Sequence, residues 1–162
     1  MQVANPEVEL ERLFDRLVGR EKRPRKRAPR AKSLFAKVLR QQELIDKVRN
    51  PVEVRLPGID TVLKAEFGYK NGHYNVIDPV DFMTEQGWLK LASARAVEGR
   101  ALARVSGSEH GPMALVVVGR FAEQTQRHRP AVRTILSEHG VRLHDFQHLD
   151  PLLADIKKHV YR

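Results

Sequence analysis

The strongest constraint on the fold is an Asn-Gly pair, Asn71-Gly72, between two runs of alternating apolar and polar residues. Asn-Gly is a favoured two-residue β-hairpin loop because both loop positions need positive φ angles. The sequence therefore predicts an antiparallel hairpin over residues 62–78, with its aromatic and apolar side chains on one face. The expected cross-strand pairs are Tyr69 with Tyr74, Phe67 with Val76, and Ala65 with Asp78.

The rest of the chain alternates between helical and strand periodicity. A strand, a helix and a second strand of these lengths imply parallel crossovers. We therefore expect an α/β fold: a small mixed sheet with an antiparallel hairpin and a parallel β-α-β unit, flanked by helices, plus an N-terminal helical extension. Helices are expected over residues 6–18, 33–49, 88–105 and 125–139 and from 150 to the end, and further strands over residues 52–56, 113–119 and 141–146.

Positive charge is concentrated in one short segment. The chain has 29 basic and 20 acidic residues, and residues 20–32 supply +7 of its net charge of +9. Pro24 and Pro29 prevent a continuous helix there, and the like charges repel, so we expect an extended segment, called here the basic arm. Its basic residues are Arg20, Lys22, Arg23, Arg25, Lys26, Arg27, Arg30 and Lys32.

The basic arm divides the chain into an N-terminal amphipathic helix (1–19), the arm or linker itself (20–32) and an α/β core domain (33–162). Such an arm can neutralise phosphates by counterion release without reading base sequence. No aromatic residue is interleaved in it, which argues against a base-stacking surface. A solvated linker, or an arm that contacts an acidic protein or a membrane surface, would have the same composition.

Composition excludes several classes of function. The chain has no cysteine, which removes disulfides, thiolate zinc sites, iron–sulfur clusters and cysteine nucleophiles. Neither a Walker A nor a GxGxxG pattern is present. The longest apolar run, residues 113–118, is far shorter than the roughly 20 residues that span a bilayer, and the N-terminus lacks signal-peptide features. We expect a soluble, cytoplasmic protein without membrane contact.

Acidic residues gather around the predicted hairpin. Two carboxylates and a lysine, such as Lys64 or Lys70, could bind a magnesium ion and activate water. Solvent-facing charges on strands would account for the same residues. The acids concerned are Asp60, Glu66, Asp78 and Asp81.

Three histidines near the C-terminus do not form a metal-binding pattern. Gly140 separates His139 from His144, and His148 follows in the turn after a strand, so no single face presents all three. We interpret them as surface or capping residues, and no resident cofactor is expected.

The order of elements, with ALVVVGRF at 114–121, VRLH at 141–144 and LDPLLADI at 149–156, resembles the restriction-endonuclease-like, or PD-(D/E)XK, superfamily. The resemblance covers residues 33–162 by topology. Members of this superfamily cut or only bind nucleic acids, and many degenerate relatives belong to mobile-element and defence systems. The resemblance thus implies a DNA-binding or other nucleic-acid role, in bacterial or phage defence for example.

The superfamily's active site has an Asp near one central strand and Glu-x-Lys on the next. Here the segment that should hold Glu-x-Lys, residues 75–81, has no lysine, and Lys64-Ala-Glu66 has the two types in reversed order. A site that has moved would use Asp60, Asp78 and Lys70, with Glu66 as a further candidate. We expect a core without catalytic activity.

Three functions follow from these observations. The leading one is a nucleic-acid-associated binding protein, with a non-catalytic nuclease-like core and a phosphate-binding basic arm. The first alternative is a protein-interaction module, an inhibitor or assembly factor, whose helices at 6–18 and 33–49 bind a second copy or a protein partner. The second alternative is a metal-dependent nuclease, the only one of the three that needs magnesium.

Overall fold

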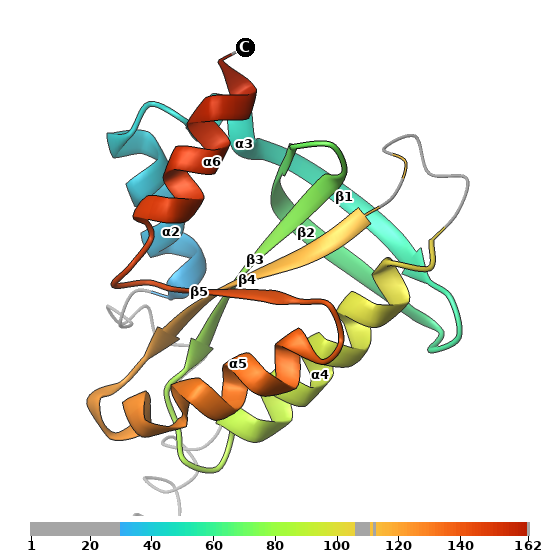
Figure 1. Ribbon diagram of the computed structural model, residues 1–162, viewed down its shortest axis with the longest axis vertical. Coiled ribbons are helices and arrows are strands. Elements are labelled where there is room, and N and C mark those ends of the chain that lie inside the picture. Colours follow the sequence, from blue (N-terminus) through green and yellow to red (C-terminus); the bar gives the residue numbers. More distant parts are fainter. Residues whose placement is uncertain (1–29, 106–110, 112, 162) are drawn as a thin grey trace, which may run out of the picture.

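The computed structural model describes residues 30–105, 111 and 113–161 (Figure 1). The predicted helix at 6–18 and the basic arm up to residue 29 lie outside the described residues. Within them, the expected mixed α/β architecture is confirmed. In chain order the elements are α2 (Ala31–Gln41), α3 (Ile45–Val48), β1 (Arg49–Leu56), β2 (Thr61–Lys70), β3 (Tyr74–Phe82), α4 (Trp88–Leu102), β4 (Met113–Phe121), the 3₁₀ helix η2 (Glu123–His128), α5 (Arg129–Ser137), β5 (Arg142–Asp145) and α6 (Asp150–Val160).

The five strands form one sheet in the order β1-β2-β3-β4-β5. β1, β2 and β3 pair antiparallel, whereas β3, β4 and β5 run parallel to one another. The sequence predicted one parallel β-α-β unit, and the structure has two, with α4 and α5 in the connections. No helix in the described part of the chain is both long and apolar enough to cross a membrane.

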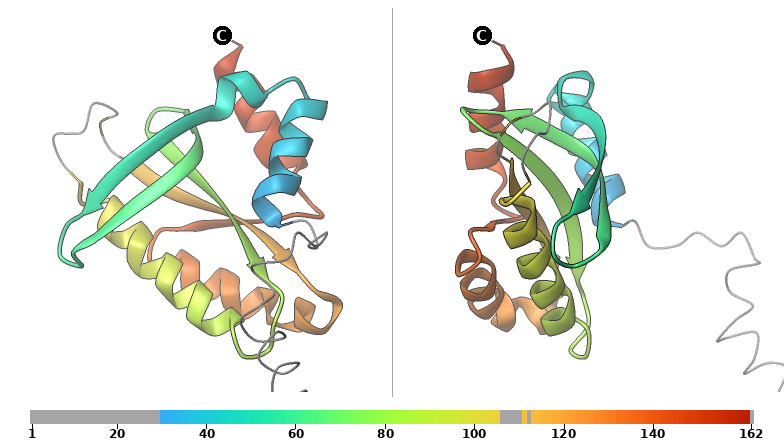
Figure 2. Two further views of the ribbon diagram at one scale, coloured as in Figure 1. Left: turned by 180° about the vertical axis from the view of Figure 1, so that it is seen from behind. Right: turned by 90° about the vertical axis from the view of Figure 1, so that its right-hand side faces the viewer.

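Each face of the sheet has its own apolar core. Alternation along β4 shows this directly: Leu115 and Val117 pack in a cluster with α4 and α5, whereas Val116 and Val118 pack with α2 and α6. Figure 2 shows α2 lying beside α6, away from α4 and α5. The central strands are therefore covered on both faces, as is usual for parallel sheets.

The hairpin between β2 and β3 exists, but its predicted register was wrong by one residue. Tyr69 pairs with Asn75, and Phe67 pairs with Ile77, so the loop has three residues rather than two. Tyr74 and Val76 then lie in the cluster with α4, opposite Phe67 and Tyr69. Hydrophobic patterning fixes register only when one face is buried. Since β3 is buried on both faces here, apolar residues could not select between the two registers.

Side-chain hydrogen bonds around the loop favour the observed register. Asn75 is fully buried, and its Nδ2 donates to Asn71 Oδ1 at 2.7 Å. Asn71 Nδ2 in turn donates to Asp155 Oδ2 on α6 at 2.9 Å, and the Tyr69 hydroxyl donates to the same oxygen at 2.5 Å. Arg142 Nη2 satisfies Asn75 Oδ1 at 2.8 Å. A shift by one residue would leave these buried amide groups without partners, which is costly.

The single helix predicted over residues 33–49 is two helices. Glu43 has a φ of 58°, a left-handed conformation that ends α2, and Leu44 is fully buried after it. Contacts from α6 hold this bend: Lys157 Nζ donates to Gln42 Oε1 at 2.6 Å, and the Tyr161 hydroxyl donates to Glu43 O at 2.9 Å. Burial of Leu44 and these tertiary bonds offset the roughly 1–2 kcal/mol that the left-handed conformation costs.

The β2 strand separates from β3 after the Phe67–Ile77 pair. Residues 61–65 of β2 pair only with β1, and β3 continues to Phe82 paired only with β4. Figure 1 shows the β1–β2 hairpin and β3 running apart, and we call the region where β2 and β3 cease to pair the fork. Pro79 lies in β3 beyond the branch point. Proline has no backbone N–H to donate to a neighbouring strand. It is tolerated here because β3 no longer pairs with β2 at this position.

A buried glycine on α4 allows a test of the packing between α4 and the sheet. A Cβ at Gly99 would overlap Val141 Cγ2 and would lie 3.3 Å from Leu115 Cβ. Gly99→Ala should gain up to about 1 kcal/mol in helix propensity, but the added methyl has no room and overpacking costs about 1–3 kcal/mol. We expect a net loss in the free energy of unfolding, measured in urea. The exposed Ser93→Ala on the same helix is the control and should be slightly stabilising; a stabilised Gly99→Ala would contradict the packing.

Candidate functional site

The fork brings together two acids from neighbouring strands. Glu66 immediately precedes Phe67 on β2, and Asp78 immediately follows Ile77 on β3. Because Phe67 and Ile77 are paired, the two acids lie next to that pair, where the strands begin to separate. Both side chains are partly buried: 40% of the Glu66 side chain and 24% of the Asp78 side chain remain exposed.

Each acid at the fork has a basic partner from a helix. Lys32 Nζ on α2 lies 3.0 Å from Glu66 Oε1, and its charge also acts on Asp78. Arg95 Nε on α4 lies 2.5 Å from Asp78 Oδ2 as an ion pair without the alignment of a hydrogen bond. Arg95 Nη1 also lies 3.5 Å from Glu98 Oε2. These five residues, the fork cluster, alternate in charge across the opening.

Burial determines the electrostatics of the fork cluster. Desolvation raises the pKa of Asp78 above its ordinary value, although Arg95 and Lys32 act in the opposite direction. Desolvation likewise raises the pKa of Glu98, with Arg95 opposing it. Burial thus disfavours the ionised forms of Asp78 and Glu98, and the neighbouring cations oppose this effect.

The basic arm joins the core beside the fork. The backbone N–H of Ala31, the first residue of α2, donates to Asp81 Oδ2 at 3.0 Å, and Arg120 Nε donates to Asp81 Oδ1 at 2.7 Å. Arg30 provides no side-chain cap for α2, so Asp81 on β3 supplies both the acceptor and the negative charge that a helix N-terminus favours. The last residues of the arm are thus fixed to β3 three residues beyond Asp78.

An open pocket of about 430 Å³ adjoins the fork. Its charged lining is Lys32 and Glu66 of the fork cluster together with Glu53 and Lys64, and Val52 and Ala65 supply apolar surface. The pocket lies over the part of the β1–β2 hairpin that has separated from β3. It gives a ligand access to the Lys32–Glu66 pair.

The structure brings together only part of the site predicted from the sequence. Asp60 is exposed in the β1–β2 turn and pairs with Arg55 at 2.8 Å. Six residues of extended strand, roughly 20 Å, separate it from Glu66. Lys70 lies at the opposite end of β2, where it pairs with Tyr74. The structure therefore does not bring Asp60 and Lys70 together with Asp78, and the lysine at the fork is Lys32 from the basic arm.

Sequence reasoning missed Arg95, Glu98 and the Asp81–Arg120 pair. A charged pair spaced i, i+3 on an otherwise alanine-rich helix was a usable signal for Arg95 and Glu98. Pro79 signalled that one edge of β3 is open. Nothing in the sequence connects Lys32 to Glu66, since that contact depends on where α2 packs.

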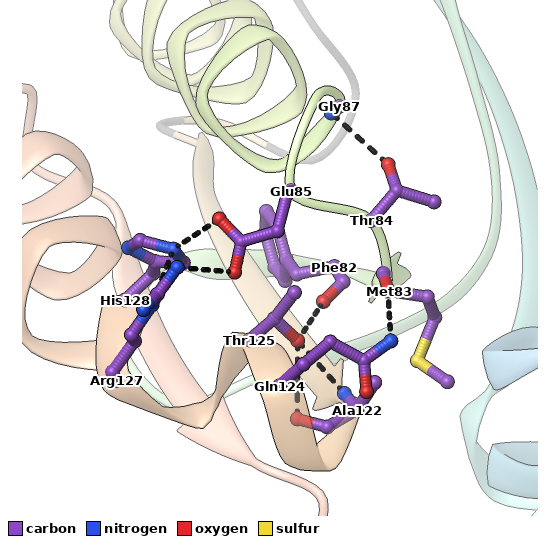
Figure 3. Close-up of polar contacts among 10 residues, drawn as sticks. All are labelled: Phe82, Met83, Thr84, Glu85, Gly87, Ala122, Gln124, Thr125, Arg127 and His128. Atoms are coloured by element: carbon purple, nitrogen blue, oxygen red, sulfur yellow. Dashed lines mark hydrogen bonds and ion pairs between the residues drawn. The ribbon is translucent and has the colours of Figure 1, made fainter.

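A second polar cluster lies at the carboxyl ends of β3 and β4 (Figure 3). Glu85, in the loop before α4, accepts from Arg127 Nη2 and lies 2.9 Å from His128 Nε2. The His128 contact lowers the pKa of Glu85, and Arg127 adds to the effect. His128 also stacks on Trp88, with ring centroids 4.3 Å apart. The Thr125 hydroxyl donates to Phe82 O at 2.6 Å. These contacts fasten the η2 segment to the loop that follows β3.

The C-terminal histidines do not form a metal site with the other described residues. Among residues 30–105, 111 and 113–161, no three histidine or acidic side chains gather in a way that could hold a metal ion. His139 Nδ1 instead lies 3.1 Å from Ile135 O within its own helical region. Burial lowers the pKa of His144, with Arg142 and Arg133 acting in the same direction.

Comparisons of the chain with protein-family models, with curated proteins and with solved structures each find no match. A functional hypothesis therefore depends on the fork cluster and the attachment of the arm.

The raised pKa of Asp78 predicts a definite pH dependence of stability. At pH values between the ordinary pKa of 3.8 and the higher folded-state pKa, the Asp78 carboxyl is ionised in the unfolded chain but stays protonated in the folded chain. The stabilisation is thus complete below 3.8 and is lost as pH rises through that range. We expect the free energy of unfolding of the wild type, minus that of Asp78→Asn, to fall with rising pH.

Urea unfolding of both proteins at a series of pH values measures this difference. Other carboxylates, such as Asp155 with its lowered pKa, cancel in the subtraction. A difference that rises with pH would mean that attraction to Arg95 and Lys32 outweighs desolvation at Asp78.

Proposed function

We propose that this protein binds nucleic acid through its basic arm, which delivers phosphate-binding residues to the mouth of the fork in a nuclease-like core without catalytic activity. The observation that carries the proposal is the attachment of the arm: Ala31 is tied to Asp81, and Lys32 reaches Glu66. A segment with seven net positive charges is thus continuous with a side chain inside the fork. Phosphates held by the arm would lie next to the fork.

The arrangement of the core supports a nuclease-like comparison. Glu66 and Asp78 come from adjacent central strands, β2 and β3, which is where the PD-(D/E)XK superfamily places its acids. The sheet continues with a parallel β4 after α4, in the order that prompted the resemblance. A lysine is also present, although it comes from α2 rather than from β3.

The ion pairs support the non-catalytic part of the proposal. Lys32 occupies an oxygen of Glu66, and Arg95 occupies an oxygen of Asp78. A divalent cation at these oxygens would have to displace both basic side chains and overcome their repulsion. The fork cluster is therefore better suited to holding the arm and its phosphates than to activating water.

Packing of α2 weakens the protein-interaction alternative. That hypothesis uses the apolar sides of the helices predicted over 6–18 and 33–49, of which the first lies outside the described residues. Phe35 and Leu39 are fully buried, and they pack with α6 and the sheet in the second core cluster. The apolar side of α2 is thus already covered within the core.

The salt dependence of binding tests the role of the arm. For duplex DNA, each phosphate contact contributes about −0.9 to the slope of log affinity against log salt. Replacing Arg23, Arg25, Lys26 and Arg27 by Ala should weaken binding strongly and make the slope shallower by about 3–4. Titrations at several salt concentrations against duplex DNA, single-stranded DNA and RNA give both quantities and identify the preferred nucleic acid.

A control variant separates the arm from net charge. Lys47, Lys70, Arg133 and Lys158 are exposed on four different elements, and their replacement by Ala removes the same charge. We expect this variant to retain most of the affinity and slope. Equal losses in the two variants would show general electrostatic attraction, and unchanged binding by the arm variant would contradict the proposal.

Incubation of the full chain with plasmid DNA, single-stranded DNA and RNA in magnesium or manganese tests the absence of catalysis. We expect no cleavage above that of a Glu66→Gln/Asp78→Asn double variant. Metal-dependent cleavage that this double variant lacks would support the nuclease alternative instead.

A further inference from the structure

A groove on the far side of α4 combines positive charge with apolar surface. It has a volume of about 390 Å³ and lies between the β1–β2 turn and the C-terminal half of α4, which Figure 1 shows next to each other. Arg100 and Arg104 of α4 line it together with His139, which follows α5. None of the described residues that line the groove carries a carboxylate.

The two arginines have no structural role as ion-pair partners within the described part of the chain. Arg95, five residues before Arg100 on α4, pairs with Asp78 and Glu98 at the fork. Arg100 and Arg104, by contrast, have no ion pair or side-chain hydrogen bond with any residue of 30–105, 111 and 113–161. The C-terminal end of a helix favours basic residues, but that preference does not explain the apolar surface beside them.

The apolar surface is formed by Val97, Ala101 and Ile59. Val97 is 46% exposed, which makes it one of few large apolar side chains of the described chain left open to solvent. A nucleic-acid backbone would match the arginines but would leave this surface uncovered. An acidic peptide with apolar side chains would satisfy both features, with carboxylates at Arg100 and Arg104 and an apolar side chain over Val97.

We propose that this groove binds an acidic, amphipathic segment of a partner protein. Arg100 and Arg104 provide the charge recognition, since arginine binds carboxylates with two parallel hydrogen bonds. Val97 and Ile59 provide the apolar contact. None of the described residues that line the groove belongs to the basic arm, so the proposed interaction does not require nucleic-acid binding.

Fluorescence anisotropy with a labelled twelve-residue peptide tests the proposal on the full chain. In the probe, Glu and Leu recur at helical spacing; one control peptide has Lys in place of Glu, and another has Ser in place of Leu. We expect the Glu-Leu peptide to bind at least tenfold more tightly than either control. Arg100→Glu/Arg104→Glu should lose at least tenfold in affinity for it, and Val97→Ser should lose several-fold.

Matched variants make the outcome decisive. Lys70→Glu/Lys158→Glu carries the same charge change at exposed positions away from the groove and should retain the affinity. The arm variant should bind the peptide normally, so failure of the nucleic-acid proposal would leave this one standing. Equal binding of all three peptides, or unchanged binding by Arg100→Glu/Arg104→Glu with native circular dichroism, would overturn it. Loss of duplex DNA binding in that variant, without selective peptide binding, would assign the groove to phosphates instead.

Discussion

The separation of β2 from β3 after the Phe67–Ile77 pair determines how the rest of the molecule is arranged. A strand pair that stayed together to its end would have placed Glu66 and Asp78 on a continuous sheet surface. Separation instead opens a fork between the β1–β2 hairpin and β3, and helices approach it from two sides. Lys32 then reaches the opening from α2, and Arg95 reaches it from α4.

Charge pairing is the physical consequence of this arrangement. Carboxylates that are three-quarters buried are costly unless cations or hydrogen-bond donors compensate them. Arg95 compensates Asp78 within the core, and Asp81 beyond it is compensated by Arg120 and by the first N–H of α2. The same bonds that satisfy Asp81 also fix the start of α2. The charge of Asp81 on β3 therefore determines where the basic arm joins the core.

Much of the fold could be predicted from the sequence, because the long alanine-rich segment 88–102 and the continuous apolar run 113–118 have few alternatives. Local sequence signals gave the wrong hairpin register and missed the break in the helix over 33–49, because tertiary contacts determine both. Asn71-Gly72 predicts a two-residue loop, yet Asn71 and Asn75 bond to groups on α6 and β5 and set a three-residue loop. The helix over 33–49 breaks at Glu43 because Leu44 is buried beneath α6. At the fork, Glu66 and Asp78 were candidates from the start, but their partners come from helices whose docking no sequence pattern reveals.

Nuclear magnetic resonance mapping of a short duplex oligonucleotide on the labelled full chain tests the central claim most directly. If the arm delivers phosphates to the fork, amide shifts should concentrate at the start of α2 and at Glu66, Asp78 and Val80 around the opening. Residues of β5, at the edge of the sheet opposite β1, and of α5 beside it should change little. Shifts centred on α5 and β5, or none in the core while the arm residues shift, would show that the fork takes no part in binding.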